Sequence, residues 1–220
     1  MSGLSDDEVN AKLATIHTKY KLTYGQFWEE LPEQKMAARY LTGKEKVLEI
    51  GGNLGRNTFV IAHIVGDDNL VTLESNPLFA AQLMVNRNMN GRHFHVEASA
   101  LSARKLIQNH WTSQPSEVLQ DNHQWVNTIT WADLQKKYNI PFDTLVLDCE
   151  GAFYYILVDT PEILDNINLI IMENDFRTAE HKEYARNQFK EHGFQRIYHE
   201  RHPDINWHPD ILDFFEVWKK

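Results

Sequence analysis

Short apolar runs alternate with stretches of helical periodicity along most of this chain. The runs that predict strands are residues 46–50, 70–73, 92–96, 126–130, 142–147, 169–172, 194–199 and 212–218. The stretches that predict helices between them are residues 53–65, 77–90, 131–138 and 178–192. This alternation predicts an α/β fold in which a mostly parallel sheet carries helices on both faces. We expect the last two runs to close the sheet as an antiparallel pair.

Two further helices are expected before the first strand. Ser5 and Glu8 fit a capping box for a helix that runs to about residue 19, and a second helix is expected over residues 32–43. The stretch 102–121 has the least regular pattern in the chain. We expect a helix followed by a surface excursion there.

Length and composition suit a single domain. The chain has 220 residues, of which 42% are apolar, and this is enough for one core. We expect the helices of residues 1–43 to cover a ligand pocket and residues 44–220 to form a Rossmann-like core. The only cysteine, Cys149, cannot form an internal disulfide, which suits a reducing compartment.

Charge and hydropathy restrict the partners. A formal net charge of −9 with a pI near 5.6 argues against broad electrostatic binding to nucleic acid or to an anionic membrane. No apolar run approaches the roughly 20 residues that span a bilayer, and the polar, acidic start MSGLSDDEVN is not a signal peptide. We therefore expect a cytoplasmic protein without a membrane span, with nucleic acid disfavoured as a partner. The oligomeric state is left open.

Acidic residues stand at the ends of the predicted strands. They are Glu49, Glu74, Glu97, Asp148, Glu150, Glu173 and Asp175. The carboxyl ends of parallel strands meet at one edge of a sheet, and ligands bind beyond that edge. We expect these residues to surround a binding site.

The stretch VLEIGGNLG, residues 47–55, predicts the first turn from strand to helix. Gly51, Gly52 and Gly55 allow a tight turn and a close approach of a ligand to the backbone. The following helix offers free N–H groups to an anionic group. Glu74 ends the next strand, where a carboxylate can accept hydrogen bonds from both hydroxyls of a ribose. Together these features predict a cofactor that contains a nucleoside.

The residues around the glycines favour one such cofactor. The spacing does not match G-x-G-x-x-G, in which the middle glycine makes room for a pyrophosphate. Glu49 stands two positions before the first glycine, and an acid fits better beside a cation. S-adenosylmethionine carries an ammonium and a carboxylate instead of a pyrophosphate. We expect Glu49 on its ammonium side, in contact directly or through water, with helix N–H groups or Asn53 and Asn57 on its carboxylate.

Four motifs in order resemble the FkbM family of S-adenosylmethionine-dependent methyltransferases. They are VLEIGGNLGRNT, LESNP, FDTLVLDCEGAFYYIL and LIIMEND, and the resemblance covers about residues 44–200. It implies the class I methyltransferase fold, with seven strands and a closing antiparallel hairpin. It also implies methylation of hydroxyl groups, often on sugars or glycosylated products. In this chain Phe153 stands where the family usually has a glutamate, which puts the usual acceptor site in doubt.

The resemblance also implies a set of cofactor contacts. It places Glu74 at the ribose, and a backbone N–H and a side-chain oxygen of residues 97–99, after the third strand, at the adenine. The implied cofactor-binding residues are Glu49, Gly51, Gly52, Asn53, Gly55, Asn57, Glu74, Ser75, Glu97, Ala98, Ser99 and Asp148.

Methyl transfer from a sulfonium is an in-line displacement that a positioned base can assist. Asp148 and Glu150 of the DCEG motif are the expected base or acceptor anchor, and capping of the next helix is the alternative role for them. Oxygen ligands on two neighbouring strand ends, with Glu173 and Asp175 on the second, also suit Mg²⁺ or Mn²⁺. Metal dependence stays open at this point.

Three residues are expected on the acceptor side. They are Glu173 and, in the aromatic segment before the first strand, Gln26 and Trp28; packing of that segment on the sheet is the alternative. His199, His202 and His208 match no zinc spacing and are expected to face solvent from the closing hairpin.

These observations predict an S-adenosylmethionine-dependent O-methyltransferase that acts on a hydroxyl of a carbohydrate or glycoconjugate. Three alternatives stay open: an oxidoreductase of the NAD type, a nucleic-acid 2′-O-methyltransferase, and a non-catalytic subunit that has kept the cofactor pocket.

Overall fold

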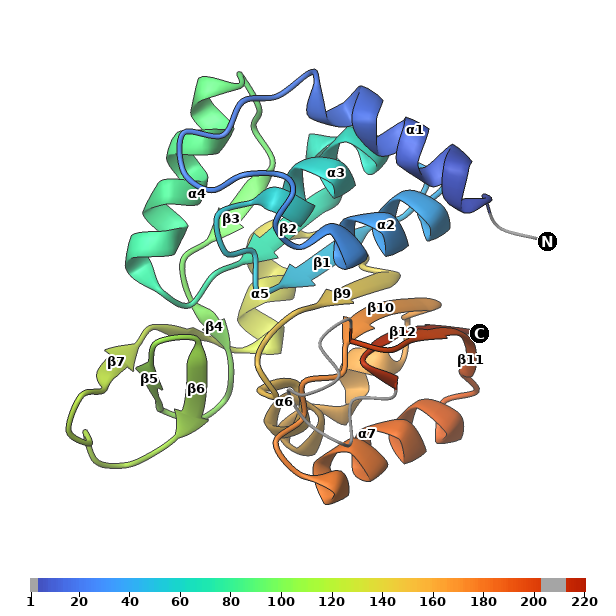
Figure 1. Ribbon diagram of the computed structural model, residues 1–220. Coiled ribbons are helices and arrows are strands. Elements are labelled where there is room, and N and C mark those ends of the chain that lie inside the picture. Colours follow the sequence, from blue (N-terminus) through green and yellow to red (C-terminus); the bar gives the residue numbers. More distant parts are fainter. Residues whose placement is uncertain (1–3, 203–212) are drawn as a thin grey trace.

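A seven-stranded sheet forms the centre of the computed structural model, which describes residues 4–202 and 213–220 (Figure 1). Its spatial order is β11-β12-β10-β9-β1-β2-β3. The bounds are β1 Val47–Ile50, β2 Leu70–Leu73, β3 His95–Glu97, β9 Thr144–Leu147, β10 Leu169–Glu173, β11 Gln195–Glu200 and β12 Phe215–Lys219. Only β12 runs against the others. The predicted mostly parallel sheet with a closing antiparallel hairpin is confirmed.

Helices cover both faces of this sheet. They are α1 Asp6–His17, α2 Leu31–Tyr40, α3 Arg56–Val65, α4 Pro77–Met89, α5 Trp131–Tyr138, α6 Phe153–Asp159 and α7 Ala179–Glu191, with 3₁₀ turns at Asp67–Asn69 and Pro161–Leu164. The predicted capping box is present, because Ser5 and Glu8 exchange hydrogen bonds at the start of α1. None of the helices in the described ranges is long and apolar enough to cross a membrane.

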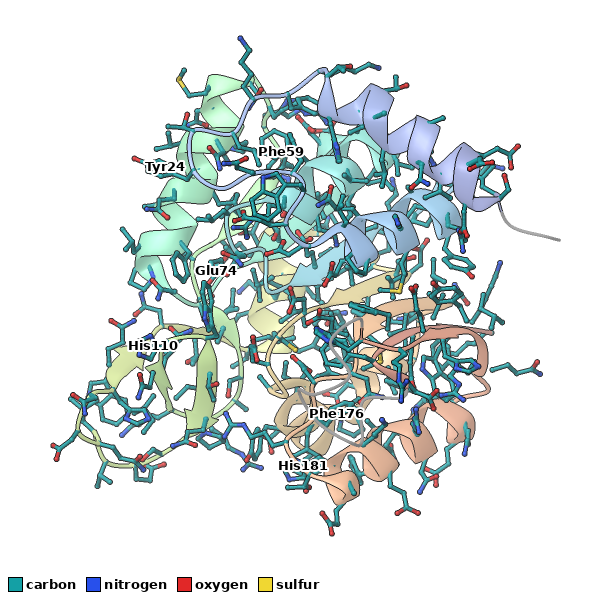
Figure 2. All side chains as sticks on the ribbon, in the orientation of Figure 1. Tyr24, Phe59, Glu74, His110, Phe176 and His181 are labelled. Atoms are coloured by element: carbon teal, nitrogen blue, oxygen red, sulfur yellow. The ribbon has the colours of Figure 1, made fainter. Side chains whose placement is uncertain are left out.

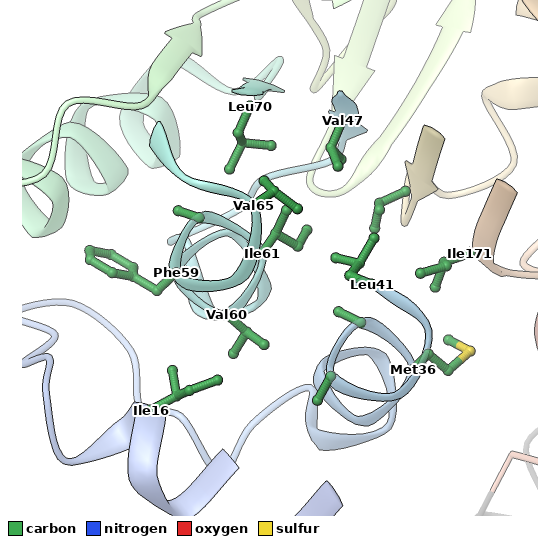
Figure 3. Close-up of a cluster of buried hydrophobic side chains, with 14 of the residues drawn as sticks. Ile16, Met36, Leu41, Val47, Phe59, Val60, Ile61, Val65, Leu70 and Ile171 are labelled. Atoms are coloured by element: carbon green, nitrogen blue, oxygen red, sulfur yellow. The ribbon is translucent and has the colours of Figure 1, made fainter. Parts of the chain in front are cut away.

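The two faces of the sheet carry separate hydrophobic clusters. Successive strand residues point to opposite faces, so Val47 packs with α1, α2 and α3 while Leu48 packs with α5, α6 and α7. In Figure 1 the first three helices lie above the sheet and α6 and α7 lie below it. Figure 3 shows the first cluster, in which Ile61 and Val65 of α3 face Val47 and Leu70 of the sheet, while Val60 on the other side of α3 faces Ile16 of α1. Glu49 shares the face of Val47 and is buried on it.

The stretch 102–121 is not helical, so that prediction is wrong. It belongs to a second, three-stranded antiparallel sheet of order β6-β5-β7, which stands at the lower left in Figure 1. The elements of this region are β4 Ala100–Leu101, β5 Leu106–Asn109, β6 Thr112–Pro115, β7 Gln124–Val126 and β8 Thr128–Ile129. His110 and Trp111 form a two-residue hairpin turn, with His110 at φ 52°. This turn was missed because it contains no glycine, the usual residue at positive φ.

Helix boundaries differ from the predicted ones by a few residues. Helix α2 ends before residue 43, because Leu41 is already extended at φ −83° and ψ 133°. Helix α3 begins at Arg56 because residues 51–55 are used by the glycine turn. The first residue of the predicted strand 212–218 lies outside the described residues.

The glycine turn is packed against two neighbouring strands. Gly51 has φ +98°, and a Cβ there would lie 1.6 Å from the carbonyl oxygen of Asp148. A Cβ on Gly52 would lie 2.2 Å from the hydroxyl oxygen of Thr72. The space that a side chain would need at these two glycines is therefore filled by the protein's own atoms.

We expect Gly51→Ala to lower the free energy of unfolding by about 3 kcal/mol or more, because its Cβ overlaps the Asp148 carbonyl. Gly193→Ala is the matched control, since Gly193 has φ +86° and nothing within 4 Å of the Cβ position. It should cost only about 1–2 kcal/mol for the left-handed backbone. Urea unfolding measures both. Equal losses would show that the contact with Asp148 is not the constraint.

Candidate active site

A cavity of about 270 Å³ lies at the carboxyl ends of β1, β2, β9 and β10. The start of α2, the loop after β9 and the second sheet complete its wall. Six of the residues that line it are acidic: Glu30, Glu33, Glu74, Asp148, Glu150 and Glu173. No lysine, arginine or histidine of the described chain is among the lining residues. The cavity is therefore suited to a positively charged occupant.

Glu74 connects the glycine turn to the end of β2. One carboxylate oxygen accepts the backbone N–H of Asn53 at 2.7 Å, and the other accepts that of Asn76 at 2.7 Å. Burial raises the pKa of Glu74, and these two N–H groups act against the rise. Ser75 also lines the cavity, and its hydroxyl accepts a hydrogen bond from Gln108 of β5 at 2.9 Å. Both residues thus border the cavity at the end of β2, and the ribose contact expected of Glu74 stays a prediction.

An aromatic pair forms the wall beside Glu74. The rings of Phe79 from α4 and Trp111 from the β5–β6 turn stack at 4.7 Å with an interplanar angle of 13°. Both line the cavity. In Figure 2 the neighbouring His110 lies on the side of the second sheet that faces Glu74. Sequence reasoning missed this pair, since only the folded hairpin brings Trp111 to Phe79.

Only part of the segment that was predicted to lie beside the adenine, residues 97–99 after β3, lines the cavity. Ser99 is buried and lines the cavity, whereas Ala98 is exposed and Glu97 does not line it. The carboxylate of Glu97 instead accepts hydrogen bonds from Lys137 at 2.6 Å and Tyr138 at 2.8 Å. Burial opposes ionisation of Glu97, but these bonds hold its pKa below the ordinary value. Ser99 alone can therefore reach a ligand directly.

Of the residues of the first turn, Gly51 and Asn53 line the cavity and Gly52, Gly55 and Asn57 do not. Asn53 donates a side-chain hydrogen bond to Glu30 at 3.0 Å. All five residues were expected to contact the cofactor, but only Gly51 and Asn53 are in the wall of the cavity.

Glu49 is also absent from the lining, although the sequence places it at the cofactor. It is 2% exposed and accepts a hydrogen bond from the hydroxyl of Thr58 at 2.6 Å. Burial raises the pKa of Glu49 to about 7. Val47 and Glu49 share the face of β1 that α2 and α3 cover, so this carboxylate points into the packed face and not into the cavity.

Three carboxylates meet at the ends of β9 and β10, on the other side of β1 from Glu74. Oxygens of Asp148, Glu173 and Asp175 all lie within 4.8 Å of one another. Burial first, and then the charges of Glu30 and Asp175, raise the pKa of Asp148 well above its ordinary value. Burial and the charge of Asp148 do the same for Glu173. Burial and the charge of Glu150 raise the pKa of Asp175 to about 7.

Glu150 lines the cavity from the DCEG turn. Its backbone is in the left-handed region at φ 54°, which is uncommon for a residue with a side chain. Burial raises its pKa, and the charge of Arg177 opposes that rise. The alternative that Asp148 or Glu150 caps α6 is wrong, because Ala152 occupies the N-cap and no side chain caps it.

The N-terminal segment reaches the cavity through residues that differ from the expected ones. Trp28 is 66% exposed and donates its indole N–H to Gln26, and neither residue lines the cavity. Glu30 and Glu33 line it instead. Glu30 pairs with Arg56 at 2.5 Å, and burial raises its pKa to about 7. The start of α2 thus takes the position that Gln26 and Trp28 were expected to occupy.

Neither His199 nor His202, the two of these three histidines that lie within the described residues, lines the cavity. His199 of β11 bonds to Asp213 at 2.8 Å, and His202 packs edge-on against Phe214 at 4.9 Å. His208 lies outside the described residues.

No protein-family model matches the chain, and no curated protein matches it. Solved structures do resemble it. The cofactor-bound protein Rv0187 from MTB superposes with a TM-score of 0.52 at 17% identity, over 98% of this chain and 90% of that one. Sp1610 of Streptococcus pneumoniae, a candidate tRNA (m1A22) methyltransferase, gives 0.52 at 12% identity, over 86% and 68%. An O-methyltransferase from Bacillus cereus in complex with SAH gives 0.50 at 14%, over 99% and 92%. At these identities the likeness establishes the Rossmann-like fold of class I methyltransferases.

We expect Glu49→Gln to change how stability depends on pH. The pKa of Glu49 is about 7 in the folded chain and 4.5 ordinarily, so its contribution is complete below about pH 4.5 and is lost as the pH rises to about 7. The loss amounts to at most about 3 kcal/mol. Glutamine stays neutral, so the variant should lose less stability between pH 5 and pH 8 in urea unfolding. Glu162→Gln, at an exposed position, is the control. Equal pH slopes for both variants and the parent would contradict the assignment.

Proposed function

We propose that this chain is an S-adenosylmethionine-dependent methyltransferase that methylates a hydroxyl of a sugar or glycoconjugate, like the FkbM family that its motifs resemble. The observation that carries the proposal is one cavity lined by Glu74 at the end of β2 and by Asp148 and Glu150 after β9, on the other side of β1. Glu74 can bind the ribose of a cofactor. Asp148 or Glu150 can accept the proton of an acceptor hydroxyl.

The groups on the two sides of the cavity suit the two parts of the cofactor, its adenosine and its charged methionine portion. Glu74, Ser99 and the ring of Phe79 offer hydrogen-bond acceptors and a flat apolar wall for an adenosine. The acidic end suits the sulfonium and ammonium groups. Among proteins with this fold, the Bacillus cereus enzyme is an O-methyltransferase with SAH bound, which supports this cofactor for the present chain.

The charge of the cavity argues against the alternatives. A dinucleotide would bring its pyrophosphate among six carboxylates without a basic side chain in the lining, and like charges in a buried site repel strongly. The phosphates of a nucleic acid meet the same obstacle, although one protein with this fold is a candidate tRNA methyltransferase. A neutral sugar hydroxyl brings no such charge.

Glu150 is our assignment for the base. During methyl transfer the acceptor oxygen forms its bond to the methyl carbon while the carbon–sulfur bond breaks, and the hydroxyl proton passes to a carboxylate. The raised pKa of Glu150 brings it closer to neutral pH, where a base is most effective. Asp148 is the alternative base, but its oxygen already lies within the cluster with Glu173 and Asp175.

Equilibrium dialysis tests the cofactor. We expect S-adenosylmethionine to bind and NAD not to bind, and Glu74→Ala to weaken binding about 10–100-fold because hydrogen bonds to the ribose are lost. Glu162→Gln serves as the control for a lost surface charge. Tight binding of NAD without S-adenosylmethionine would overturn the proposal.

Methyl transfer to a panel of mono- and oligosaccharides tests the acceptor and the base. Glu150→Gln should reduce kcat by roughly 10²–10⁴-fold and leave binding of S-adenosylmethionine unchanged. Unchanged turnover would remove Glu150 from the mechanism. Failure of the parent chain on every acceptor, despite cofactor binding, would favour a non-catalytic subunit.

A further inference from the structure

The second sheet places a buried glutamine, Gln108, in the wall of the cavity. Side chains alternate along a strand, so Leu106 and Gln108 of β5 line the cavity while Ile107 and Asn109 do not. Gln108 is only 3% exposed. Because buried polar atoms in proteins are nearly always hydrogen-bonded, the partners of Gln108 indicate whether this wall is complete without a ligand.

Only one end of the Gln108 amide has a partner in the described part of the chain. Its Nε2 donates a hydrogen bond to the hydroxyl of Ser75 at 2.9 Å. Its Oε1 is buried and accepts no hydrogen bond from any described residue. A buried amide oxygen without a donor costs free energy. The free oxygen therefore indicates a ligand that provides an N–H or O–H group.

The position of Gln108 fits one part of the proposed cofactor. Ser75, which holds the amide, directly follows Glu74, the residue that we assign to the ribose. In S-adenosylmethionine the sulfonium and the adenine are attached to opposite sides of the ribose. The acidic residues after β9 and β10 suit the sulfonium, so the adenine is expected on the side of β2 and β5, where Gln108 stands.

An aromatic surface comes from the same two segments as this hydrogen bond. Phe79 and Ser75 belong to the first turn of α4 and the loop before it, and Trp111 and Gln108 belong to the β5–β6 hairpin. The two rings stack with their centroids 4.7 Å apart, and both line the cavity. A purine has flat faces that pack on such rings and polar atoms along its edge. A flat wall beside a free amide therefore suits a base.

The segment after β3 provides few partners for that base. Ser99 is the only one of residues 97–99 in the lining. The carboxylate of Glu97 is held by Lys137 and Tyr138 outside the cavity. Adenine carries an amino group and several ring nitrogens, so one serine leaves part of its edge without a partner. Gln108 can supply the missing contact.

We propose that Gln108 accepts a hydrogen bond from the exocyclic amino group of the cofactor's adenine and so selects adenine over other bases. Its Oε1 binds the amine while Ser75 holds Nε2. A glutamine amide is a common partner of this amino group in proteins that read adenine. A base with a carbonyl in place of the amine provides no donor and leaves Oε1 unpaired. The inference rests on the proposed function for the identity of the cofactor.

Calorimetric titration of the full chain with two ligands tests the proposal. One is S-adenosylhomocysteine, and the other is its analogue with purine in place of adenine, which lacks only the amino group. We expect the parent chain to bind the analogue about tenfold or more weakly, because Oε1 then stays buried without a donor. Gln108→Met should weaken binding of S-adenosylhomocysteine to a similar extent. It should bind both ligands equally to within about twofold, because the acceptor for the amine is gone.

Two further variants keep the test decisive. Gln124→Met is the matched control, since Gln124 is exposed and pairs with Gln108 across the strands of the second sheet; both affinities should stay unchanged. Gln108→Glu retains an acceptor oxygen and should keep the preference for S-adenosylhomocysteine, which gives a second variant if Gln108→Met fails to fold by circular dichroism.

The outcomes separate the inference from the proposed function. Equal binding of both ligands by the parent chain would overturn the role of Gln108, and so would an undiminished preference in Gln108→Met. Either result would leave the cofactor of the proposed function intact. A parent chain that binds neither S-adenosylmethionine nor S-adenosylhomocysteine would overturn the proposed function, and the inference with it.

Discussion

The contact between Gly51 and the carbonyl of Asp148 is the constraint on which the site depends. It closes the ends of β1 and β9 onto each other, and the N–H of Asp148 adds a hydrogen bond of 3.0 Å to Ile50. Because the chain turns sharply there, the N–H of Asn53 reaches the carboxylate of Glu74 on the neighbouring strand. Three strand ends thereby border one cavity. A side chain at position 51 would force them apart.

Burial of so many carboxylates in one place works against folding, because charged groups lose hydration and repel one another. The structure limits that penalty in two ways. Glu74 accepts backbone N–H groups and Glu30 pairs with Arg56. The carboxylates of Asp148 and Glu173, at the ends of β9 and β10, have mainly other carboxyl groups around them, and burial together with this mutual repulsion raises their pKa values. Such an arrangement is typical of a functional site, where stability has not been the only constraint on the residues.

Much of the fold was predictable because it depends on local periodicity. Apolar runs and helical stretches gave the order of the elements, and alternating strands and helices can form few sheets other than a parallel one. Glu74 was predictable because it follows a strand directly. The β5–β6 hairpin was not, since its turn uses His110 at positive φ in place of glycine. Trp111 and Glu33 escaped prediction because no local pattern relates them to the sheet edge.

The sequence by itself determined the parallel sheet, the glycine turn and the gathering of acids at the strand ends, because each follows from spacing along the chain. The tertiary structure decided which acids face the cavity. Glu49 lies on the helix-covered face of β1 and is used in the core, whereas Glu33 arrives from α2 at the cavity wall. The physical reason is that the face on which a strand residue lies, and the helix that covers it, depend on long-range packing that spacing along the chain does not encode.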